Sequence, residues 1–211
     1  MLLNFPQLVS KYKVKADGCI HVGAHYAQEH PQYAAAGIKR FVYIEPCADA
    51  FNVLKNKFGA HHHIQLFNYA CGDTEGQQVM YTGSQNEGQS NSLLKMDKHL
   101  QIHPGITLPN TELVSVKRLD SLGLAHKGYQ LLVMDCQGYE GRVLKGGMET
   151  LKQMNYVYTE INRDTVYKDC TLIEELNELL DDFMPVEIGG WVGGMWSDAF
   201  YVRKTLLMAS I

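Results

Sequence analysis

The stretch Cys19–Glu29, which reads C-I-H-V-G-A-H-Y-A-Q-E, decides the fold. An apolar run comes first, a small-residue turn follows at Gly23-Ala24, and the residues after the turn are able to start a helix. In an open α/β sheet, a strand–turn–helix unit brings backbone N–H groups close to a ligand at the carboxyl end of the first strand. An ordinary strand–helix connection has the same pattern, so the rest of the chain must supply the other walls of a site.

The chain repeats this unit downstream. Apolar strands are predicted at about 18–22, 41–44 and 64–69, with helices at about 28–36 and 48–58 between them. Continuous apolar strands are typical of a parallel sheet covered on both faces, and its crossovers are expected to be right-handed.

The second half returns to the same alternation. It contains predicted strands at about 130–134, 155–159, 186–188 and 199–203, with helices that end near 153 and 182. The sequence therefore predicts a doubly wound, Rossmann-like α/β fold with about seven mostly parallel strands, the last antiparallel, and helices on both faces.

One domain over residues 1–211 is expected, because this length is enough for a single buried core. Residues 1–16 form a short N-terminal extension. Residues 82–111 form an inserted loop rich in Gly, Ser, Asn and Gln. Loops this long are often lids or binding loops, so we expect a partly mobile flap, with a passive surface insertion as the alternative.

Composition excludes several classes of protein. The net charge of −4 disfavours a nucleic-acid binder, and no apolar run reaches the roughly 18 residues of a membrane span. The start of the chain lacks the pattern of a secretory signal. Five widely spaced cysteines without a C-x-x-C pair predict no disulfide framework and a cytoplasmic setting. The oligomeric state stays open.

Carboxylates follow the predicted strand ends, where ligands bind in a doubly wound sheet. The residues placed at these ends are Gly23, Ala24, His25, Glu45, Cys71, Gly72, Asp73, Asp135 and Glu160. Scattered surface acids would not fall in register with strand ends so regularly.

Two of these acids have specific tasks available. Glu45, about 20 residues past the turn, is able to accept two hydrogen bonds from a ribose diol. Asp73 is able to accept one from an adenine amino group. The alternatives are a solvated acid before Pro46 and a turn-forming aspartate.

The sequence has no phosphate cradle. The turn reads G-A-H-Y-A instead of G-x-G-x-x-G, and no G-x-x-x-x-G-K-[ST] occurs. An adenosyl ligand without a phosphate chain therefore fits best. S-adenosylmethionine is the predicted cofactor, whereas dinucleotides fit poorly.

Several segments together resemble the FkbM-type methyltransferases. They are G-A-H-Y-A-Q-E, V-Y-I-E-P, N-Y-A-C-G-D, N-S-L-L, V-K-R-L-D-S-L, D-C-Q-G-Y-E-G-R-V-L-K-G and T-E-I-N. The resemblance runs in order from about Cys19 to Asn162. Its most specific piece is Asp135-x-Gln137-Gly138-x-Glu140 followed by V-L-K-G.

This resemblance implies a class I, S-adenosylmethionine-dependent fold with O-methyltransferase activity on a hydroxyl of a sugar, glycan or small natural product. It implies that Gly23 and its neighbours face the methionine part of the cofactor, Glu45 the ribose and Asp73 the adenine. Asp135 would border cofactor and acceptor. The cofactor-binding candidates are His21, Gly23, Ala24, His25, Glu29, Glu45, Pro46, Cys71, Gly72, Asp73 and Asp135.

The sequence departs from the family pattern at two positions. His21 stands where an acid is common, and Ala27 stands where a second glycine is common. His25 and Glu29 are placed to compensate. His21 itself lies inside an apolar strand, where a hydrogen-bonded core histidine is the expected reading.

Methyl transfer to a hydroxyl requires an aligned donor and acceptor and a nearby proton acceptor. Asp135 and Glu160 are the catalytic candidates, with Asp135 preferred as the base. Asp135, Glu160 and Asn162 would alternatively hold a divalent cation, but no recognisable ligand spacing demands one, so no metal is predicted.

Three functions remain open from the sequence. The first is an active O-methyltransferase, the second is a non-catalytic module that keeps the fold, and the weakest is a nicotinamide-dependent oxidoreductase. The acceptor is not identified. Trp191 and Trp196, flanked by glycines, would stack on a sugar ring or would only close the sheet edge.

Overall fold

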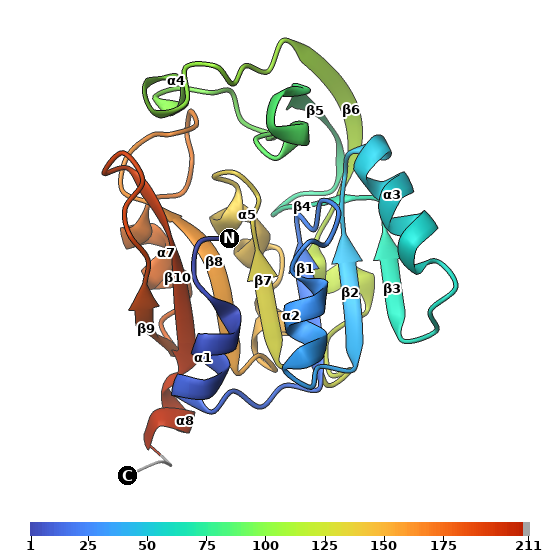
Figure 1. Ribbon diagram of the computed structural model, residues 1–211, viewed down its shortest axis with the longest axis vertical. Coiled ribbons are helices and arrows are strands. Elements are labelled where there is room, and N and C mark those ends of the chain that lie inside the picture. Colours follow the sequence, from blue (N-terminus) through green and yellow to red (C-terminus); the bar gives the residue numbers. More distant parts are fainter. Residues whose placement is uncertain (209–211) are drawn as a thin grey trace.

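The computed structural model describes residues 1–208, and a seven-stranded sheet forms its centre (Figure 1). The strand order is β3-β2-β1-β7-β8-β10-β9. The strands are β1 Gly18–Val22, β2 Arg40–Ile44, β3 Ile64–Phe67, β7 Leu131–Met134, β8 Tyr156–Asn162, β9 Phe183–Ile188 and β10 Trp196–Arg203. β10 runs antiparallel to both of its neighbours, whereas the pairs from β3 to β8 are parallel. The predicted doubly wound sheet with its last strand antiparallel is confirmed.

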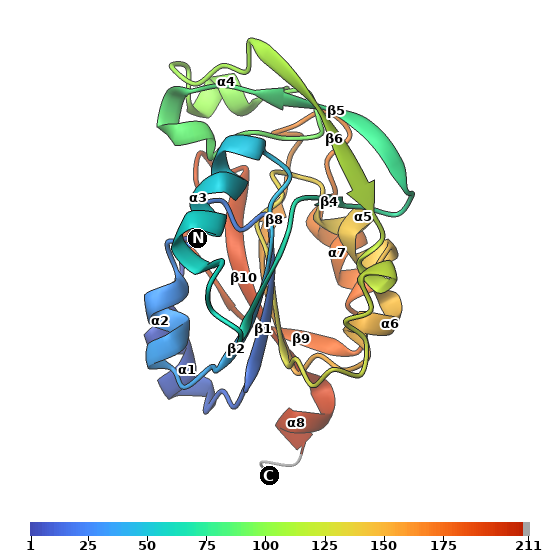
Figure 2. The same ribbon diagram turned by 90° about the vertical axis from the view of Figure 1, so that its right-hand side faces the viewer.

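Helices cover both faces of this sheet (Figure 2). One face carries α1 Phe5–Tyr12, α2 His30–Ala35 and α3 Ala48–Phe58. The other face carries α5 Glu140–Lys145, α6 Met148–Leu151 and α7 Ile173–Leu179. The last described helix, α8 Lys204–Met208, follows β10 at the end of the sheet opposite the carboxyl edge (Figure 1).

Two apolar clusters lie on the two faces of the sheet, because successive side chains of a strand point to opposite faces. In β2, Phe41 and Tyr43 belong to the cluster under α1, α2 and α3. Val42 and Ile44 belong to the cluster under α5, α6 and α7. This burial on both faces explains why the strands are continuously apolar.

A second, three-stranded sheet stands above the carboxyl edge of the first (Figure 1). It consists of β4 Ala70–Cys71, β6 Asn110–Lys117 and β5 Gly76–Thr82, in that order. Residues 83–109 connect β5 to β6 and contain η1 Gln85–Gly88 and α4 His99–Ile102. We call residues 83–109 the cap. A further short turn of helix, η2 Leu119–Leu122, follows β6.

Hydrogen bonds tie the cap to the loop that follows β8. The Asp97 N–H donates to the Val166 carbonyl at 3.0 Å, and the Lys168 N–H donates to the Lys95 carbonyl at 2.7 Å. The Lys98 ammonium lies 2.6 Å from an Asp164 carboxylate oxygen. The segment predicted as a partly mobile flap is therefore anchored to this loop around residues 95–98.

Several elements end at other residues than predicted, for local steric reasons. β3 ends at Phe67, since the chain turns there to enter the second sheet at Ala70. The helix expected to end near residue 153 breaks after Lys145. A Cβ on Gly146 would lie 1.9 Å from the Gly72 carbonyl oxygen, so the backbones touch at the break. β10 begins at Trp196, three residues earlier than predicted.

No helix among residues 1–208 is long and apolar enough to cross a membrane. The last three residues of the predicted domain, 209–211, lie outside the described part of the chain.

Candidate active site

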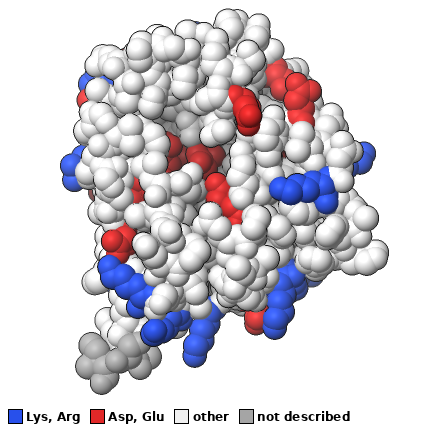
Figure 3. All heavy atoms as spheres, viewed as in Figure 1, with Lys and Arg blue, Asp and Glu red and all other residues white. Residues whose placement is uncertain are grey.

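A cavity of about 350 Å³ lies between the carboxyl edge of the large sheet and the cap. The space-filling view shows this hollow, with acidic side chains at its base (Figure 3). We call the carboxyl ends of β1, β2, β7 and β8, together with the loops that follow them, the floor of the cavity. A cavity at the switch point of a doubly wound sheet is the expected ligand site of the fold.

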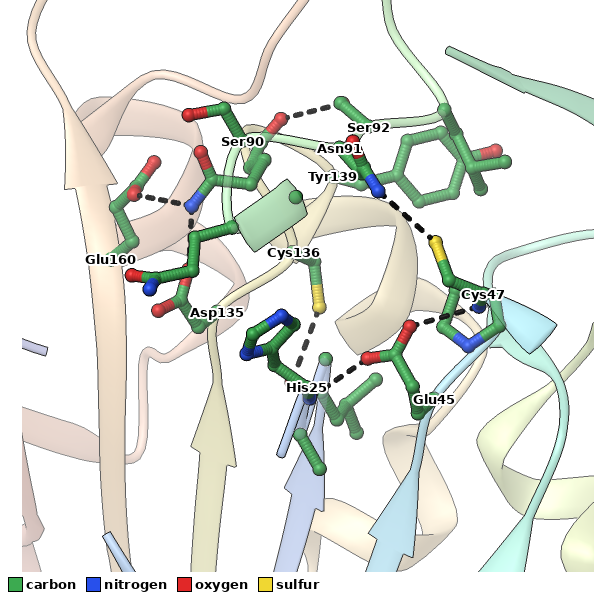
Figure 4. A pocket seen from close by; sticks show the side chains of 18 of the residues that line it. His25, Glu45, Cys47, Ser90, Asn91, Ser92, Asp135, Cys136, Tyr139 and Glu160 are labelled. Carbon is green, nitrogen blue, oxygen red and sulfur yellow. Dashed lines mark hydrogen bonds between the residues drawn. The ribbon is translucent and has the colours of Figure 1, made fainter. Parts of the chain in front are cut away.

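Most of the residues predicted from the sequence line this cavity. They are His21, Gly23, Ala24, His25, Glu29, Glu45, Pro46, Cys71, Asp135 and Glu160. Figure 4 shows His25 and Glu45 beside each other, with Asp135 and Glu160 farther along the same wall. Residues in or directly after five strands, β1, β2, β4, β7 and β8, thus meet in one space.

Gly72 and Asp73 are a correction, because neither lines the cavity. The Tyr139 ring lies 3.1 Å from the position of a Cβ on Gly72, and Tyr139 faces the cavity in its place. After Gly72 the chain packs against the backbone of Gly146. Tyr69 and Cys71 provide the lining that had been predicted from Asp73.

Gly23 makes the turn after β1 sterically possible. Its φ is +75°, and a Cβ there would lie 2.0 Å from the Asp135 carbonyl oxygen. The Gly23 and Ala24 N–H groups both donate to the Ile44 carbonyl, at 2.9 and 3.1 Å. The expectation that these N–H groups face a ligand is therefore wrong, because β2 already accepts their hydrogen bonds.

Glu45 organises the next part of the floor. One carboxylate oxygen accepts the His25 N–H at 2.8 Å and the other accepts the Cys47 N–H at 2.9 Å (Figure 4). Burial raises the pKa of Glu45 above its usual value, and the two N–H donors oppose this rise. An ionised carboxylate has about four acceptor sites, so about two remain for a ligand.

Four further acids surround the other half of the cavity, namely Glu29, Asp135, Glu160 and Asp198. Asp198 of β10 lies directly across from Glu160 of β8 in the antiparallel register. Burial and the neighbouring acids raise the pKa of Glu160 well above its usual value. Burial raises the pKa of Asp198 to about 6. Both carboxyl groups are therefore harder to ionise than exposed ones.

Among the described residues, neither lysine nor arginine lines the cavity. The cation in it is the amino group of Met1, 3.9 Å from Glu29 Oε1 and 4.0 Å from Asp135 Oδ2. Burial lowers the pKa of this amine, but nearby carboxylates outweigh that effect and raise it above 8.0. The Leu2 N–H also donates to the Asp198 carboxylate. Positive charge is thus stabilised here.

His21 and His25 differ in their surroundings. His21 is buried, both of its ring nitrogens lack a hydrogen-bond partner, and burial lowers its pKa to about 4. The expectation of a hydrogen-bonded core histidine is therefore wrong. The His25 Nδ1 lies 2.8 Å from the Gln28 amide nitrogen, and its Nε2 lies 2.9 Å from the Glu87 carbonyl of the cap. His25 thus joins the floor to the cap.

Sequence reasoning missed several residues of the cavity. Asp198 lies just before the strand predicted at 199–203, because the start of β10 at Trp196 is not visible in the sequence. Gln137 lies in the most specific motif, but the motif alone predicts no function for its side chain. No sequence pattern marks Tyr167. The lining also includes Ser90, Asn91, Ser92, His99 and His103 of the cap. Trp196 lines the cavity, whereas the Trp191 ring packs 3.6 Å from the Arg163 guanidinium.

Comparisons with known proteins identify the family of this chain. The family model of the methyltransferase FkbM domain matches residues 21–184. The 2-O-methyltransferase NoeI of Sinorhizobium fredii is 26% identical, with 69% of this chain and 66% of NoeI covered. The chain thus spans slightly less than two thirds of that relative.

Two solved structures share the fold at low sequence identity. The N-methyltransferase NodS of Bradyrhizobium japonicum has a TM-score of 0.50 at 11% identity, covering 94% of this chain and 92% of NodS. Sp1610 of Streptococcus pneumoniae has a TM-score of 0.51 at 13% identity, covering 96% and 71%. The family match extends over more than half of the sequence, and the chain belongs to the FkbM methyltransferase domain family.

Proposed function

We propose that the protein is an S-adenosylmethionine-dependent O-methyltransferase that acts on a hydroxyl of a sugar, a glycan or a small natural product. The observation that carries this proposal is the composition of the cavity. Five carboxyl groups and no lysine or arginine of the described chain line it, at the strand ends where a nucleoside is expected.

The lining fits the chemical groups of S-adenosylmethionine. Glu45 retains acceptor capacity for a ribose diol. The acids around the Met1 amine suit a ligand with an ammonium and a sulfonium group. His21 also lines the cavity, and its buried ring nitrogens have no hydrogen-bond partner, so a bound ligand would be able to provide one. When bound, this cofactor supplies an electrophilic methyl group.

The same lining disfavours a nicotinamide dinucleotide. A pyrophosphate needs cationic side chains or free backbone N–H groups, and the ionised carboxylates of this acidic lining would repel it. The N–H groups of Gly23, Ala24 and His25 already donate to Ile44 and Glu45. The oxidoreductase alternative therefore has no support at this site.

Asp135 is the better of the two candidate bases. Its side chain is 28% exposed, so an acceptor is able to reach it. Glu160 is buried, and burial and the neighbouring acids raise its pKa, so its ionised form is disfavoured there. We propose that Asp135 accepts the hydroxyl proton and that Glu160 stays neutral beside it.

The acceptor is proposed from the relative and from the cavity. NoeI is a 2-O-methyltransferase, whereas NodS is an N-methyltransferase, so the fold alone does not select oxygen. Polar cap side chains suit a neutral polyhydroxyl compound, and the acidic floor disfavours nucleic acid and other phosphorylated acceptors. We also propose a cytoplasmic location, which the free state of all five cysteine thiols supports.

Methyl-labelled S-adenosylmethionine tests this function. The protein is incubated with a neutral oligosaccharide, an amino-sugar oligosaccharide and a sugar phosphate, and the products are mapped by mass spectrometry. We expect the label on a hydroxyl oxygen of an unphosphorylated acceptor. Label on an amine nitrogen, or transfer only to the sugar phosphate, would overturn the proposed acceptor class.

Glu45→Ala tests the cofactor half separately. We expect it to weaken binding of S-adenosylmethionine by roughly 1–3 kcal/mol, because a buried acceptor is lost. Glu112→Ala is the control, since Glu112 also accepts a backbone N–H, from Ala48, but lies outside the cavity. Equal affinities in the two variants would remove Glu45 from the site.

A further inference from the structure

The Gln137 side chain bridges the two acids of the floor. Its amide nitrogen donates to Asp135 Oδ1 at 2.7 Å and to Glu160 Oε2 at 3.3 Å. These acids stand on the neighbouring strands β7 and β8, which pair in parallel. Because an amide nitrogen carries two hydrogens, it is able to serve both carboxyl groups at once.

Tyr167 orients this amide. Its hydroxyl lies 2.7 Å from Gln137 Oε1 and is also within 3.0 Å of the Ser90 carbonyl of the cap. Tyr167 is buried, and the Ser92 hydroxyl donates to the Gln137 carbonyl at 2.8 Å. A donor on the oxygen side and two acceptors on the nitrogen side leave the amide one favourable orientation.

The backbone at Gln137 is held in an unfavourable conformation. Its φ is +53°, in the left-handed region, which costs a non-glycine residue roughly 1 kcal/mol or more. Gly138 follows with a φ of +93°. A glycine at position 137 would adopt this turn without cost but would have no amide. The side chain therefore has a local task that the turn does not require.

These contacts connect the cap to the acids. The single hydroxyl hydrogen of Tyr167 lies between two acceptors, Gln137 Oε1 at 2.7 Å and the Ser90 carbonyl at 3.0 Å, and the Gln137 amide nitrogen donates onward to Asp135 and Glu160. Figure 4 shows Ser90 and Ser92 above Asp135 and Glu160 in the same wall of the cavity. A displacement of the cap would remove the Ser92 hydroxyl from the Gln137 carbonyl and would break the Asp97–Val166 hydrogen bond beside Tyr167. Gln137 and Tyr167 would then lose the contacts by which the cap holds them.

We propose that Gln137 is a positioning residue, oriented by Tyr167, that aims the Asp135 carboxylate and makes its placement depend on the seated cap. This inference rests on the proposed function for its effect on catalysis. The hydrogen-bond arrangement itself does not depend on that function.

The test compares Tyr167→Phe with Tyr201→Phe. Each removes one buried hydroxyl that is hydrogen-bonded to a side-chain amide oxygen, but Tyr201 contacts Asn177 outside the cavity. The first readout is the ¹⁵N side-chain amide resonance of Gln137, assigned by its loss in Gln137→Met. It is recorded without cofactor or acceptor. The second readout is kcat and the affinity for S-adenosylhomocysteine.

We expect Tyr167→Phe to move the Gln137 amide resonance toward that of a solvated amide and to lower kcat about tenfold, at the scale of one hydrogen bond. Affinity for S-adenosylhomocysteine should stay within about threefold, since the cofactor half is untouched. Tyr201→Phe should change neither quantity.

An unmoved Gln137 resonance in Tyr167→Phe would overturn the proposal. So would a kcat equal to that of Tyr201→Phe, because the amide would then not position the base. Absence of cofactor binding in the wild type would instead count against the proposed function, and the resonance would still decide whether Tyr167 orients Gln137.

Discussion

The floor and the cap of the cavity are built on different principles. The floor consists of short turns directly after buried parallel strands, and each turn is fixed by backbone contacts such as Gly23 against Asp135. The cap connects β5 to β6 of the small sheet. Hydrogen bonds to the loop after β8 and the His25–Glu87 contact hold it in place. The floor therefore carries the acidic side chains of the cavity in fixed turns, and the cap encloses them.

The largest expected effect is a fall in kcat in Asp135→Asn, with cofactor binding retained. Asp135→Asn keeps the shape of the floor but removes the proton acceptor, so we expect kcat to fall about 10³-fold, or about 4 kcal/mol. Calorimetry should still detect S-adenosylmethionine binding. Asp49→Asn, on the exposed start of α3, is the control. A normal rate in Asp135→Asn would transfer the role of base to another residue.

The next effect tests the rigidity of the floor. In Gly23→Ala the new methyl group would meet the Asp135 carbonyl oxygen at 2.0 Å, at a φ of +75°. We expect a loss of more than about 3 kcal/mol in the free energy of unfolding, together with loss of cofactor binding.

Gly37→Ala is the matched control, because its φ is +89° and nothing lies within 4 Å of the added Cβ. It should cost only about 1 kcal/mol, the price of the left-handed backbone. Equal unfolding free energies for the two variants, measured by chemical denaturation, would show that the turn and β7 are not in close contact.

An effect of comparable size is expected in the pH dependence of the free energy of unfolding, through Glu140 at the start of α5. Burial raises the pKa of Glu140 from 4.5 to about 7 in the folded chain. The folded chain then binds this proton more tightly than the unfolded chain. The contribution of Glu140 to the free energy of unfolding is fully present below pH 4.5 and is lost as the pH rises through 7. At about 1.36 kcal/mol per pKa unit, the loss is about 3 kcal/mol.

Glu140→Gln should remove this part of the pH dependence, because its amide does not titrate. Denaturation curves between pH 4 and 8 measure it, with the exposed Glu174→Gln as control. If wild type and Glu140→Gln change in parallel with pH, Glu140 is not the group responsible.

The smallest effect concerns the cap. Asn86, Glu87 and Gly88 all have positive φ, and Glu87 is exposed with a φ of +58°. Glu87→Gly relieves backbone strain and keeps the carbonyl that faces His25. We therefore expect the free energy of unfolding to rise by about 0.5 kcal/mol. Gln89→Gly, where φ is −63°, should lose about as much. Losses of equal size in both variants would mean that the cap is not strained at Glu87.

The sequence predicted the floor better than the cap for the same physical reason. Strand ends are marked by a switch from apolar to polar residues, and the carboxyl ends of parallel strands meet at one edge. This placed Glu45, Asp135 and Glu160 together without a structure. The error at Asp73 arose where the chain leaves the large sheet for the small one, which no local pattern signals.

The residues that sequence reasoning missed depend on contacts far apart in the chain. Asp198 reaches the cavity only because the antiparallel register sets it opposite Glu160. Tyr167 matters because its hydroxyl meets an amide thirty positions earlier. Hydrophobic periodicity reports which face of a strand is buried, but it does not report such pairings.

Calorimetric titration of the wild-type protein with S-adenosylmethionine, and separately with NAD, tests the central claim that this acidic floor is a cofactor site. We predict saturable heat with S-adenosylmethionine, weakened in Glu45→Ala, and no binding of NAD. Absence of heat with S-adenosylmethionine, or tighter binding of NAD, would contradict the account.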